Sequence, residues 1–245
     1  MSEGFSVVIP ARHASVRLPG KPLVEIHGRP MIQWVCEAAQ TSDAERVIVA
    51  TDDARIADAV EGFGGQARMT RSDHPSGSDR LLEVAEQLGW DDQHIVVNLQ
   101  GDEPLMDARN LTQVARNLAL SGCDMATLYI DIDAAEAADP NRVKLVCDAR
   151  GRALYFSRSP IPHDREGSGG EYCGHIGLYA YRVGFLKTFS ALPPSPLEQR
   201  ERLEQLRALH HGYSIHAERA LVRPGPGVDT PEDLVRVREL LEPRS

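Results

Sequence analysis

Three short runs of apolar, mostly β-branched residues stand out in the first hundred positions of the chain. They cover residues 6–9, 47–50 and 95–99, and their apolar positions are consecutive rather than alternating. Continuous runs of this kind are typical of parallel strands that are covered by helices on both faces. The pattern therefore predicts three buried strands in the N-terminal half.

Apolar residues with a helical period lie between and after these runs. The stripes are Met31, Trp34, Val35 and Ala38, then Ile56, Val60 and Phe63, then Leu81, Val84, Ala85 and Leu88. Strands and helices thus alternate from residue 5 to about residue 120. This order predicts an α/β fold with a doubly wound, mostly parallel sheet.

The middle of the chain has a different pattern. Four β-rich pieces, at residues 126–130, 143–148, 153–157 and 174–181, are separated by turn-forming sequences. Short strands with such interruptions are typical of antiparallel structure. We expect an antiparallel β lobe, covering about residues 126–182, inserted into a single domain that spans residues 1–245.

The last fifty residues return to a helical pattern. Leu203, Leu206 and Leu209 fall on one side of a predicted helical stretch that follows residues 193–196, and a strand is expected near residues 214–221. Thr230 followed by Pro231 is a typical helix start, with a capping hydroxyl and a proline in the first turn. A final helix is expected from there.

The composition fits a folded protein and narrows its class. Hydrophobic residues make up 42% of the chain and charged residues 26%, and the net charge is −9. An acidic surface lacks the long-range attraction for phosphate backbones, so nonspecific nucleic-acid binding is not expected. The N-terminus has no signal-peptide pattern, and no run approaches the roughly 20 apolar residues of a membrane span. We therefore expect a cytoplasmic protein that does not enter a membrane.

The loop after the first predicted strand carries three cations, Arg12, Arg17 and Lys21. Ligands of open parallel sheets bind beyond the carboxyl ends of the strands. Arginine clamps phosphate oxygens with two hydrogen bonds and lysine acts as a point charge, so this content favours polyphosphate binding. The alternative is a solvated basic loop. The glycine spacing of a dinucleotide fingerprint or a Walker loop is absent.

Asp102 follows the third predicted strand, in the sequence Gln-Gly-Asp-Glu-Pro. Magnesium usually takes one or two carboxylates and completes its octahedron with phosphates and water. A second carboxylate should therefore converge from elsewhere, and Asp229 is the candidate. Its alternative role is that of a helix-start residue, which is common for aspartate. The pair Asp52 and Asp53 is a rival, although capping of the following helix suits it better.

The turn at residues 75–80 leads into the third predicted helix and contains Ser78. Its hydroxyls and free backbone N–H groups could hold a base or ribose, or could simply cap the helix. The residues alone do not separate these roles.

Longer segments of the chain match a known family. They are IPARHASVRLPGKPL, SGSDR, NLQGDEP, YFSRSPIP, HIGLYAYR, PPSPLEQ, LEQLRAL and GVDTPEDL. Together, and in this order from about residue 5 to residue 241, they resemble the 3-deoxy-D-manno-octulosonate (Kdo) cytidylyltransferase family, also called CMP-Kdo synthetases. The resemblance implies a nucleotidyltransferase-like fold.

The resemblance also implies an activity. A cytidylyl group would pass from CTP to the anomeric hydroxyl of Kdo, releasing pyrophosphate and giving CMP-Kdo for lipopolysaccharide assembly. The implied enzyme is a magnesium-dependent homodimer in which the lobe at 126–182 serves dimerisation and sugar binding. In-line attack on the α-phosphorus needs positioning and charge neutralisation, so no covalent enzyme intermediate is expected.

The matching motifs assign residues to each part of this site. The implied CTP-binding residues are Arg12, Ser15, Arg17, Lys21, Ser78 and Gln100. The implied magnesium ligands are Asp102 and Asp229, which form the catalytic group together with Lys21 and Arg12. The implied sugar-binding residues are Arg158, His175, Tyr179, Glu204 and Gln205.

Other functions stay open at this point. A relative that activates 8-amino-Kdo or a sialic acid would keep the CTP half and differ around residues 150–210. A glycosyltransferase would share a sheet and an acidic metal motif, but it would not need three cations in one loop. A noncatalytic nucleotide sensor would bind CTP without turnover.

Overall fold

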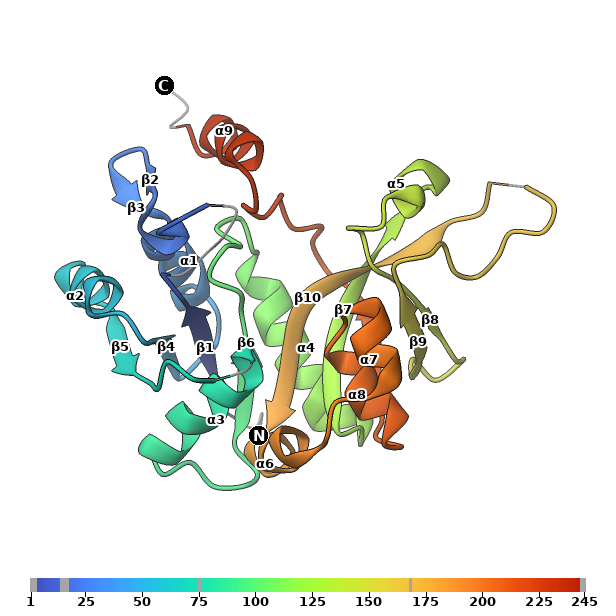
Figure 1. Ribbon diagram of the computed structural model, residues 1–245, viewed down its shortest axis with the longest axis horizontal. Coiled ribbons are helices and arrows are strands. Elements are labelled where there is room, and N and C mark those ends of the chain that lie inside the picture. Colours follow the sequence, from blue (N-terminus) through green and yellow to red (C-terminus); the bar gives the residue numbers. More distant parts are fainter. Residues whose placement is uncertain (1–3, 14–17, 75, 168, 243–245) are drawn as a thin grey trace.

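A nine-stranded sheet forms the centre of the protein in a computed structural model that describes residues 4–13, 18–74, 76–167 and 169–242 (Figure 1). Seven strands form its main path. In spatial order they are β11 (Ile215–Arg219), β7 (Met125–Ile132), β10 (Tyr172–Arg182), β6 (Ile95–Asn98), β1 (Phe5–Ala11), β4 (Arg46–Thr51) and β5 (Gln66–Met69).

The direction of these strands confirms the predicted fold class. β1 is parallel to β4 and β6, β4 is parallel to β5, and β7 is parallel to β11. β10 is antiparallel to both of its neighbours, β6 and β7. Along the described main path, β10 is therefore the strand that runs against the others, and the sheet is mixed but mostly parallel.

Helices cover both faces of this sheet. α1 (Met31–Gln40), α2 (Ala54–Gly62) and α4 (Ala108–Ser121) pack on one face, and α3 (Gly77–Gln87), α6 (Val183–Ala191) and α8 (Gln205–His210) pack on the other. In β1, Val7 and Ile9 belong to the first cluster and Val8 to the second, and all three are fully buried. Burying such a side chain contributes roughly 1.5–3 kcal/mol, which explains the unbroken apolar run.

The β-rich middle region is joined to the main sheet. β8 (Lys144–Cys147) and β9 (Ala153–Ser157) pair with each other, and β8 also pairs with the first part of β10. β7 and β10 themselves lie in the central sheet. The pairing of β10 with β7 shifts register between Ile176 and Tyr179. Before this shift β10 also pairs with β8, and after it β10 pairs with β6. The antiparallel region is thus an outgrowth of the central sheet.

Several elements differ from the predicted pattern. The helical stretch after residue 193 is two helices, α7 (Pro196–Glu201) and α8, because Arg202 has the left-handed φ of 55°. The periodicity did not reveal the 3-10 turn η1 (Lys21–Leu23), the small hairpin of β2 (Glu25–Ile26) and β3 (Arg29–Pro30), or α5 (Ala134–Ala138) and α6.

The C-terminal helix α9 (Pro231–Leu240) returns to the N-terminal part of the chain (Figure 1). Thr230 caps this helix and Pro231 lies in its first turn, as predicted from the sequence, and Asp233 completes a capping box with Thr230. Leu234 and Val237 pack with Ile26 of the small hairpin, and Arg238 donates a 2.6 Å hydrogen bond to the carbonyl of Glu25. In the described ranges, every helix is too short or too polar to span a bilayer.

Candidate active site

Three distant segments meet at the side chain of Lys21. Its ammonium contacts the carboxylate of Asp102 and donates hydrogen bonds of 2.7 Å to the carbonyl of Val228 and 3.0 Å to Oδ1 of Asp229. Lys21 begins η1, Asp102 follows β6, and Asp229 precedes α9. The structure therefore brings together the lysine and both aspartates that the sequence identified.

The turn before η1 allows this approach. Gly20 has a φ of 69°, in the left-handed region that glycine adopts without strain. Its carbonyl accepts a 2.8 Å hydrogen bond from Leu23, which closes the tight turn that carries Lys21. A side chain at position 20 would strain the turn and misplace the ammonium.

The charges of Asp102 and Asp229 change the pKa values of the neighbouring Lys21 and Glu103. Burial alone would lower the pKa of Lys21, but the charges of Asp102 and Asp229, and the hydrogen bonds to them, outweigh it and raise this pKa above its ordinary value. Burial, followed by the negative charges of Asp102 and Asp229, raises the pKa of the neighbouring Glu103 to about 8. The site thus holds more negative charge than a single ammonium can balance.

This donor set fits a magnesium ion. Asp102 and Asp229 supply carboxylate oxygens, the hard ligands that magnesium prefers. Within the described ranges, no group of three or more His, Cys, Asp or Glu side chains is placed to hold a metal. Two carboxylates with the remaining positions left to phosphate and water is the usual magnesium arrangement in phosphoryl-transfer sites.

A smaller cavity of about 270 Å³ lies beside this cluster, at the carboxyl ends of β1 and β6. Its lining residues are Pro10, Ala11, Arg12, Lys21, Pro22, Gly77, Gln100, Gly101 and Asp102. Arg12 donates hydrogen bonds to the carbonyls of His74 and Ser76, at 2.9 and 3.2 Å, so its guanidinium is held at the start of α3. The cations and the helix start form a cradle suited to an anion.

Other residues expected to bind the nucleotide lie near this cavity. Gln100 lines it, and its amide donates a 3.3 Å hydrogen bond to Asn98. Ser78 is 1% exposed in the first turn of α3, directly after the lining residue Gly77. Ser76 and Asp79 form the capping box of this helix, so Ser78 is not its cap. Ser15 and Arg17 lie outside the described residues.

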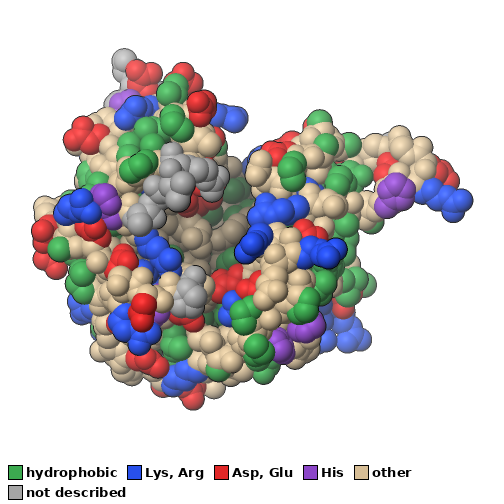
Figure 2. Space-filling model, viewed as in Figure 1, with side chains coloured by type: hydrophobic (Ala, Val, Ile, Leu, Met, Phe, Trp, Pro, Cys, Tyr) green, Lys and Arg blue, Asp and Glu red, His purple; other side chains and the backbone are tan. Residues whose placement is uncertain are grey.

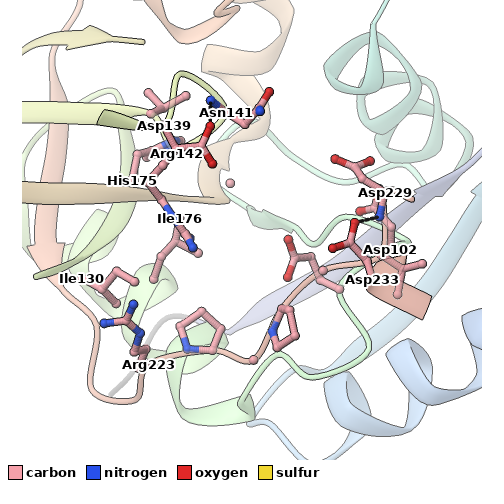
Figure 3. A pocket seen from close by; sticks show the side chains of 18 of the residues that line it. Asp102, Ile130, Asp139, Asn141, Arg142, His175, Ile176, Arg223, Asp229 and Asp233 are labelled. Atoms are coloured by element: carbon pink, nitrogen blue, oxygen red, sulfur yellow. Dashed lines mark hydrogen bonds between the residues drawn. The ribbon is translucent and has the colours of Figure 1, made fainter. Parts of the chain in front are cut away.

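A larger cavity of about 670 Å³ lies on the other side of Asp102, and both cavities share this residue. Figure 3 shows Asp102 and Asp229 on one wall and Asp139, Arg142 and His175 across from them. In Figure 2 the corresponding face is hollowed between its two halves, with basic and acidic side chains at the rim. The lining also includes Glu103, Glu136, Arg223 and Arg236.

His175 is the predicted sugar residue that lines this larger cavity. His175 Nε2 lies 3.0 Å from the hydroxyl of Thr127, which also contacts the carbonyls of Ile176 at 3.2 Å and Leu178 at 2.8 Å. Phe156 packs against the same imidazole with ring centroids 5.1 Å apart. Burial lowers the pKa of His175 to about 3, and the ring is therefore neutral at physiological pH.

Arg158 has its guanidinium on main-chain carbonyls. It donates 2.7 Å to Glu201, 3.0 Å to Pro140 and 3.5 Å to Arg202. The fully buried Lys144 binds the same region from within, with carbonyls of Asp139, Arg142 and Arg158 at 3.0, 2.6 and 2.5 Å. These two cations hold the loop at 139–142, which forms one wall of the larger cavity.

The remaining predicted sugar residues, Tyr179, Glu204 and Gln205, form a separate group next to Ser78, in which Gln205 is buried and the other two are partly exposed. Ser78 donates a 2.8 Å hydrogen bond to Glu204, and burial raises the pKa of this carboxyl above its ordinary value. Burial, then the charge of Glu204, also raises the pKa of Tyr179. Gln205 is 5% exposed, and its Nε2 atom has no hydrogen-bond partner among the described residues. Neither described cavity is lined by these three residues.

Sequence reasoning missed several charged residues of the larger cavity. Arg142 and Arg223 flank Glu136, with Arg223 in contact with its carboxylate and Arg142 3.9 Å away. Arg142 follows a turn sequence and Arg223 precedes a Pro-Gly run, and neither context marks a binding residue. The Asp52–Asp53 pair is not brought to the site as a metal pair, because Asp53 caps α2 and Asp52 lies 3.4 Å from Arg80.

The family model and two relatives that match this chain are all cytidylyltransferases. A family model described as cytidylyltransferase matches residues 6–215. The chain is 54% identical to the 3-deoxy-manno-octulosonate cytidylyltransferase of Proteus mirabilis over 242 residues, with 96% of each chain covered. It is also 54% identical to the protein of the same name from Alkalilimnicola ehrlichii over 254 aligned positions, with 98% of this chain and 97% of the relative covered.

Solved structures give the same result. The structure of a CMP:2-keto-3-deoxy-manno-octonic acid synthetase complexed with CTP is 48% identical and superposes with a TM-score of 0.91, covering 97% of this chain and 98% of that chain. A cytidylyltransferase from Leptospira borgpetersenii has 18% identity and a TM-score of 0.61, covering 96% of this chain and 84% of its own. At that identity the second structure speaks for the fold alone.

Proposed function

The chain belongs to the 3-deoxy-manno-octulosonate cytidylyltransferase family, and from this premise we propose that it transfers a cytidylyl group from CTP to the 2-hydroxyl of Kdo. Pyrophosphate and CMP-Kdo are the products, and the CMP-Kdo serves lipopolysaccharide assembly. The observation that carries the proposal is the position of Asp102. It contacts Lys21 and lines both the smaller, cation-lined cavity and the larger one.

The two cavities suit the two substrates. The triphosphate of CTP belongs in the smaller cavity, where Arg12 and Lys21 neutralise phosphate charge. The assignment of Ser15 and Arg17 to the phosphates rests on the family resemblance, because both lie outside the described residues. Ser78 and Gln100 hold the cytosine and ribose. The acid sugar belongs on the side of the larger cavity, so its hydroxyl meets the α-phosphorus beside Asp102.

The reaction is an in-line displacement. The hydroxyl oxygen of the sugar forms a bond to the α-phosphorus while the bond to the pyrophosphate oxygen breaks. Asp102 and Asp229 would hold the divalent ion, magnesium, which when bound neutralises phosphate charge and makes the hydroxyl more acidic. Lys21 adds a fixed positive charge at the same point, and the chain itself forms no covalent bond to the substrate.

The sugar half of the proposal uses residues of both groups described above. His175 faces the larger cavity as a neutral ring, and Arg158 fixes the surrounding loop while remaining close enough to the surface to meet a carboxylate. Tyr179, Glu204 and Gln205 bind sugar hydroxyls from the group beside Ser78, where Gln205 Nε2 has no hydrogen-bond partner among the described residues. The antiparallel region at 126–182 supports this pocket and the contact between two copies in a homodimer. The reaction takes place in the cytoplasm.

Pyrophosphate release tests the proposal. The protein is mixed with CTP and magnesium, and Kdo, 8-amino-Kdo and N-acetylneuraminate are added in separate reactions. Release with Kdo supports the full proposal. Preference for 8-amino-Kdo or the sialic acid would keep the CTP half and correct the sugar, while silence with all three acids would overturn the proposed activity.

A further inference from the structure

A ten-residue strap connects the last strand of the sheet to the residue proposed to bind the metal. β11 ends at Arg219, and Ala220 makes one more ladder hydrogen bond, 2.8 Å from its N–H to the carbonyl of Tyr129. The strap, residues 221–230, then leaves the sheet and crosses to α9, lining the larger cavity from Arg223 to Asp229. Its position therefore sets where Asp229 stands relative to Asp102.

The strap cannot hold itself in place as a strand. Its sequence, LVRPGPGVDT, contains two prolines without a donor N–H and two glycines with high conformational freedom. Gly225 lies so close to Leu105 that a Cβ would be 2.6 Å from that side chain, and its N–H is a long 3.4 Å from the Leu105 carbonyl. Backbone pairing along this stretch is thus sparse.

Two buried side-chain amides on α4 replace the missing strand partner. Gln113 donates 2.8 Å to the carbonyl of Arg219 and accepts 2.8 Å from the N–H of Leu221. Asn110 donates 2.8 Å to the carbonyl of Val222 and accepts 3.1 Å from the N–H of the same residue. Asn110 is fully buried and Gln113 is 8% exposed.

The spacing of the two amides suits this task. Residues three apart lie on the same face of a helix, so Asn110 and Gln113 present their amides side by side. A carboxamide carries the same donor and acceptor as a peptide group, and together the two bind backbone groups of Arg219, Leu221 and Val222. Buried backbone groups need such partners, since leaving one unpaired costs about 1–3 kcal/mol.

We propose that Asn110 and Gln113 are positioning residues that fix the strap and thereby hold Asp229 at the distance from Asp102 that binds the divalent cation. The inference rests on the proposed function, because it assumes that these two aspartates bind the metal. Downstream, the strap is fixed by the N–H of Val228, which donates 2.9 Å to the carbonyl of Asp102. The amide pair supplies the upstream anchor, and both ends are needed to define the path of a Gly-Pro segment.

Gln113→Met and Asn110→Leu remove the amides while keeping similar volume. Hydrogen exchange of the Leu221 and Val222 amides should accelerate at least about tenfold, since each loses its acceptor. Binding of Mn²⁺ alone, followed by electron paramagnetic resonance without turnover, should weaken by about tenfold, as for other groups that support metal ligands. Binding of CTP in a chelator should stay within about twofold of the wild type, because the smaller cavity does not include the strap.

Asn117→Leu is the matched control. It lies on the same helix and its Nδ2 atom is buried with no hydrogen-bond partner in the described part of the chain, so its loss should leave strap exchange and Mn²⁺ binding unchanged. If Asn110→Leu does not fold, Gln113→Met at the more accessible position and Asn110→Ser carry the test.

Two results would overturn the inference, and only the second would also overturn the proposed metal site. Faster strap exchange with wild-type Mn²⁺ affinity would overturn the inference alone, since the anchor would then be structural only. If Asp102→Asn and Asp229→Asn bind Mn²⁺ as tightly as the wild type, these two aspartates do not form the metal site of the proposed function. The inference would then fail together with that site.

Discussion

Ser78 donates a hydrogen bond of 2.8 Å to Oε1 of Glu204, which lies 126 residues further along the chain. Ser78 belongs to the expected nucleotide half of the site and Glu204 to the expected sugar half. The two halves are therefore in direct contact beneath the site. A substitution of Ser78, on the nucleotide side, should therefore change the pKa of the Glu204 carboxyl on the sugar side.

Ser78→Ala should shift the pH dependence of sugar use. Burial raises the pKa of Glu204, and the hydrogen bonds from Ser78 and Ser76 partly oppose it. Loss of one such bond, worth about 1 kcal/mol, should raise this pKa further by about 0.7 unit. The acidic limb of kcat/KM for Kdo should then move to higher pH, measured by pyrophosphate release.

Two further variants serve as controls for this pH experiment. Ser42→Ala removes a hydroxyl that binds the carbonyl of Ala39, away from the described site, and should leave the acidic limb in place. Glu204→Gln should remove the limb. A limb that is the same in Ser78→Ala, Glu204→Gln and the wild type would show that another group titrates.

Asp102→Asn should lower turnover far more than it weakens CTP binding. Asp102 is the residue shared by both cavities, and loss of metal assistance removes several kcal/mol of transition-state stabilisation, or about a thousandfold in kcat. Pyrophosphate release gives kcat, and calorimetry with CTP gives the binding constant. Wild-type turnover in this variant would contradict the catalytic assignment.

Asp107→Asn is the matched control for Asp102→Asn. Asp107 caps α4, with its side chain accepting from the N–H of Arg109, and it lies outside both cavities. Asparagine caps helices about as well as aspartate, so both stability and turnover should be close to those of the wild type.

The elements that could be predicted from the sequence are those whose signal is local. The run at 47–50 became β4 because residues buried on both faces leave an unbroken apolar stretch. The break between α7 and α8 at Arg202 has no such signal, since a left-handed φ of 55° is uncommon for an arginine and its residue type does not mark it. The small hairpin of β2 and β3 is too short to show a period.

The residues of the candidate site likewise differ in how far the sequence alone could identify them. Lys21 and Asp102 could be identified because each follows a buried strand at the ligand-binding edge of the sheet. Lys21 contacts Asp229 across 208 residues of chain. The sequence alone offered Asp229 only as a candidate beside a helix-start role, and the resemblance was needed to favour the metal role. The binding of Arg158 to main-chain carbonyls depends on where α7 ends, and this position was not predictable from the sequence.

Lys144→Met should destabilise the protein strongly. The ammonium is fully buried and donates to three main-chain carbonyls, and a methionine would leave all three without this donor. Breaking a buried charged network of this kind costs about 3 kcal/mol, which corresponds to a fall in Tm of about 6–12 °C for a chain of this length. Urea unfolding and calorimetry measure both quantities.

The exposed Lys187 gives the comparison for Lys144. It forms a 2.7 Å ion pair with Asp92 at the surface, and pairs of this kind contribute at most about 1 kcal/mol. Lys187→Met should therefore change Tm little. Equal losses in the two variants would mean that the three carbonyls bound by Lys144 find other partners, and that the loop at 139–142 does not depend on it.

His175 should make the folded protein less stable as the pH falls below about 6.5. Its pKa is lowered by burial to about 3, so the folded state keeps it neutral while the unfolded chain takes up a proton. Because the unfolded state then binds more protons, the free energy of unfolding decreases toward acid, by about 2 kcal/mol between pH 7 and pH 5 from this group. Other groups contribute to the total slope, and a difference between variants isolates this one.

The difference to measure is that between the wild type and His175→Gln in urea unfolding at pH 7 and pH 5. At pH 7 the variant should be the less stable, because it loses the packing against Phe156 and alters the contact with Thr127. At pH 5 the gap should close by about 2 kcal/mol, since glutamine has no proton to exclude. His94, whose pKa burial also lowers, provides the check: His94→Gln should leave the His175 contribution intact, and the two effects should add in the double variant. A gap between wild type and His175→Gln that is independent of pH would mean that the imidazole has the same pKa in the folded and the unfolded protein, and that burial does not keep the ring neutral at pH 5.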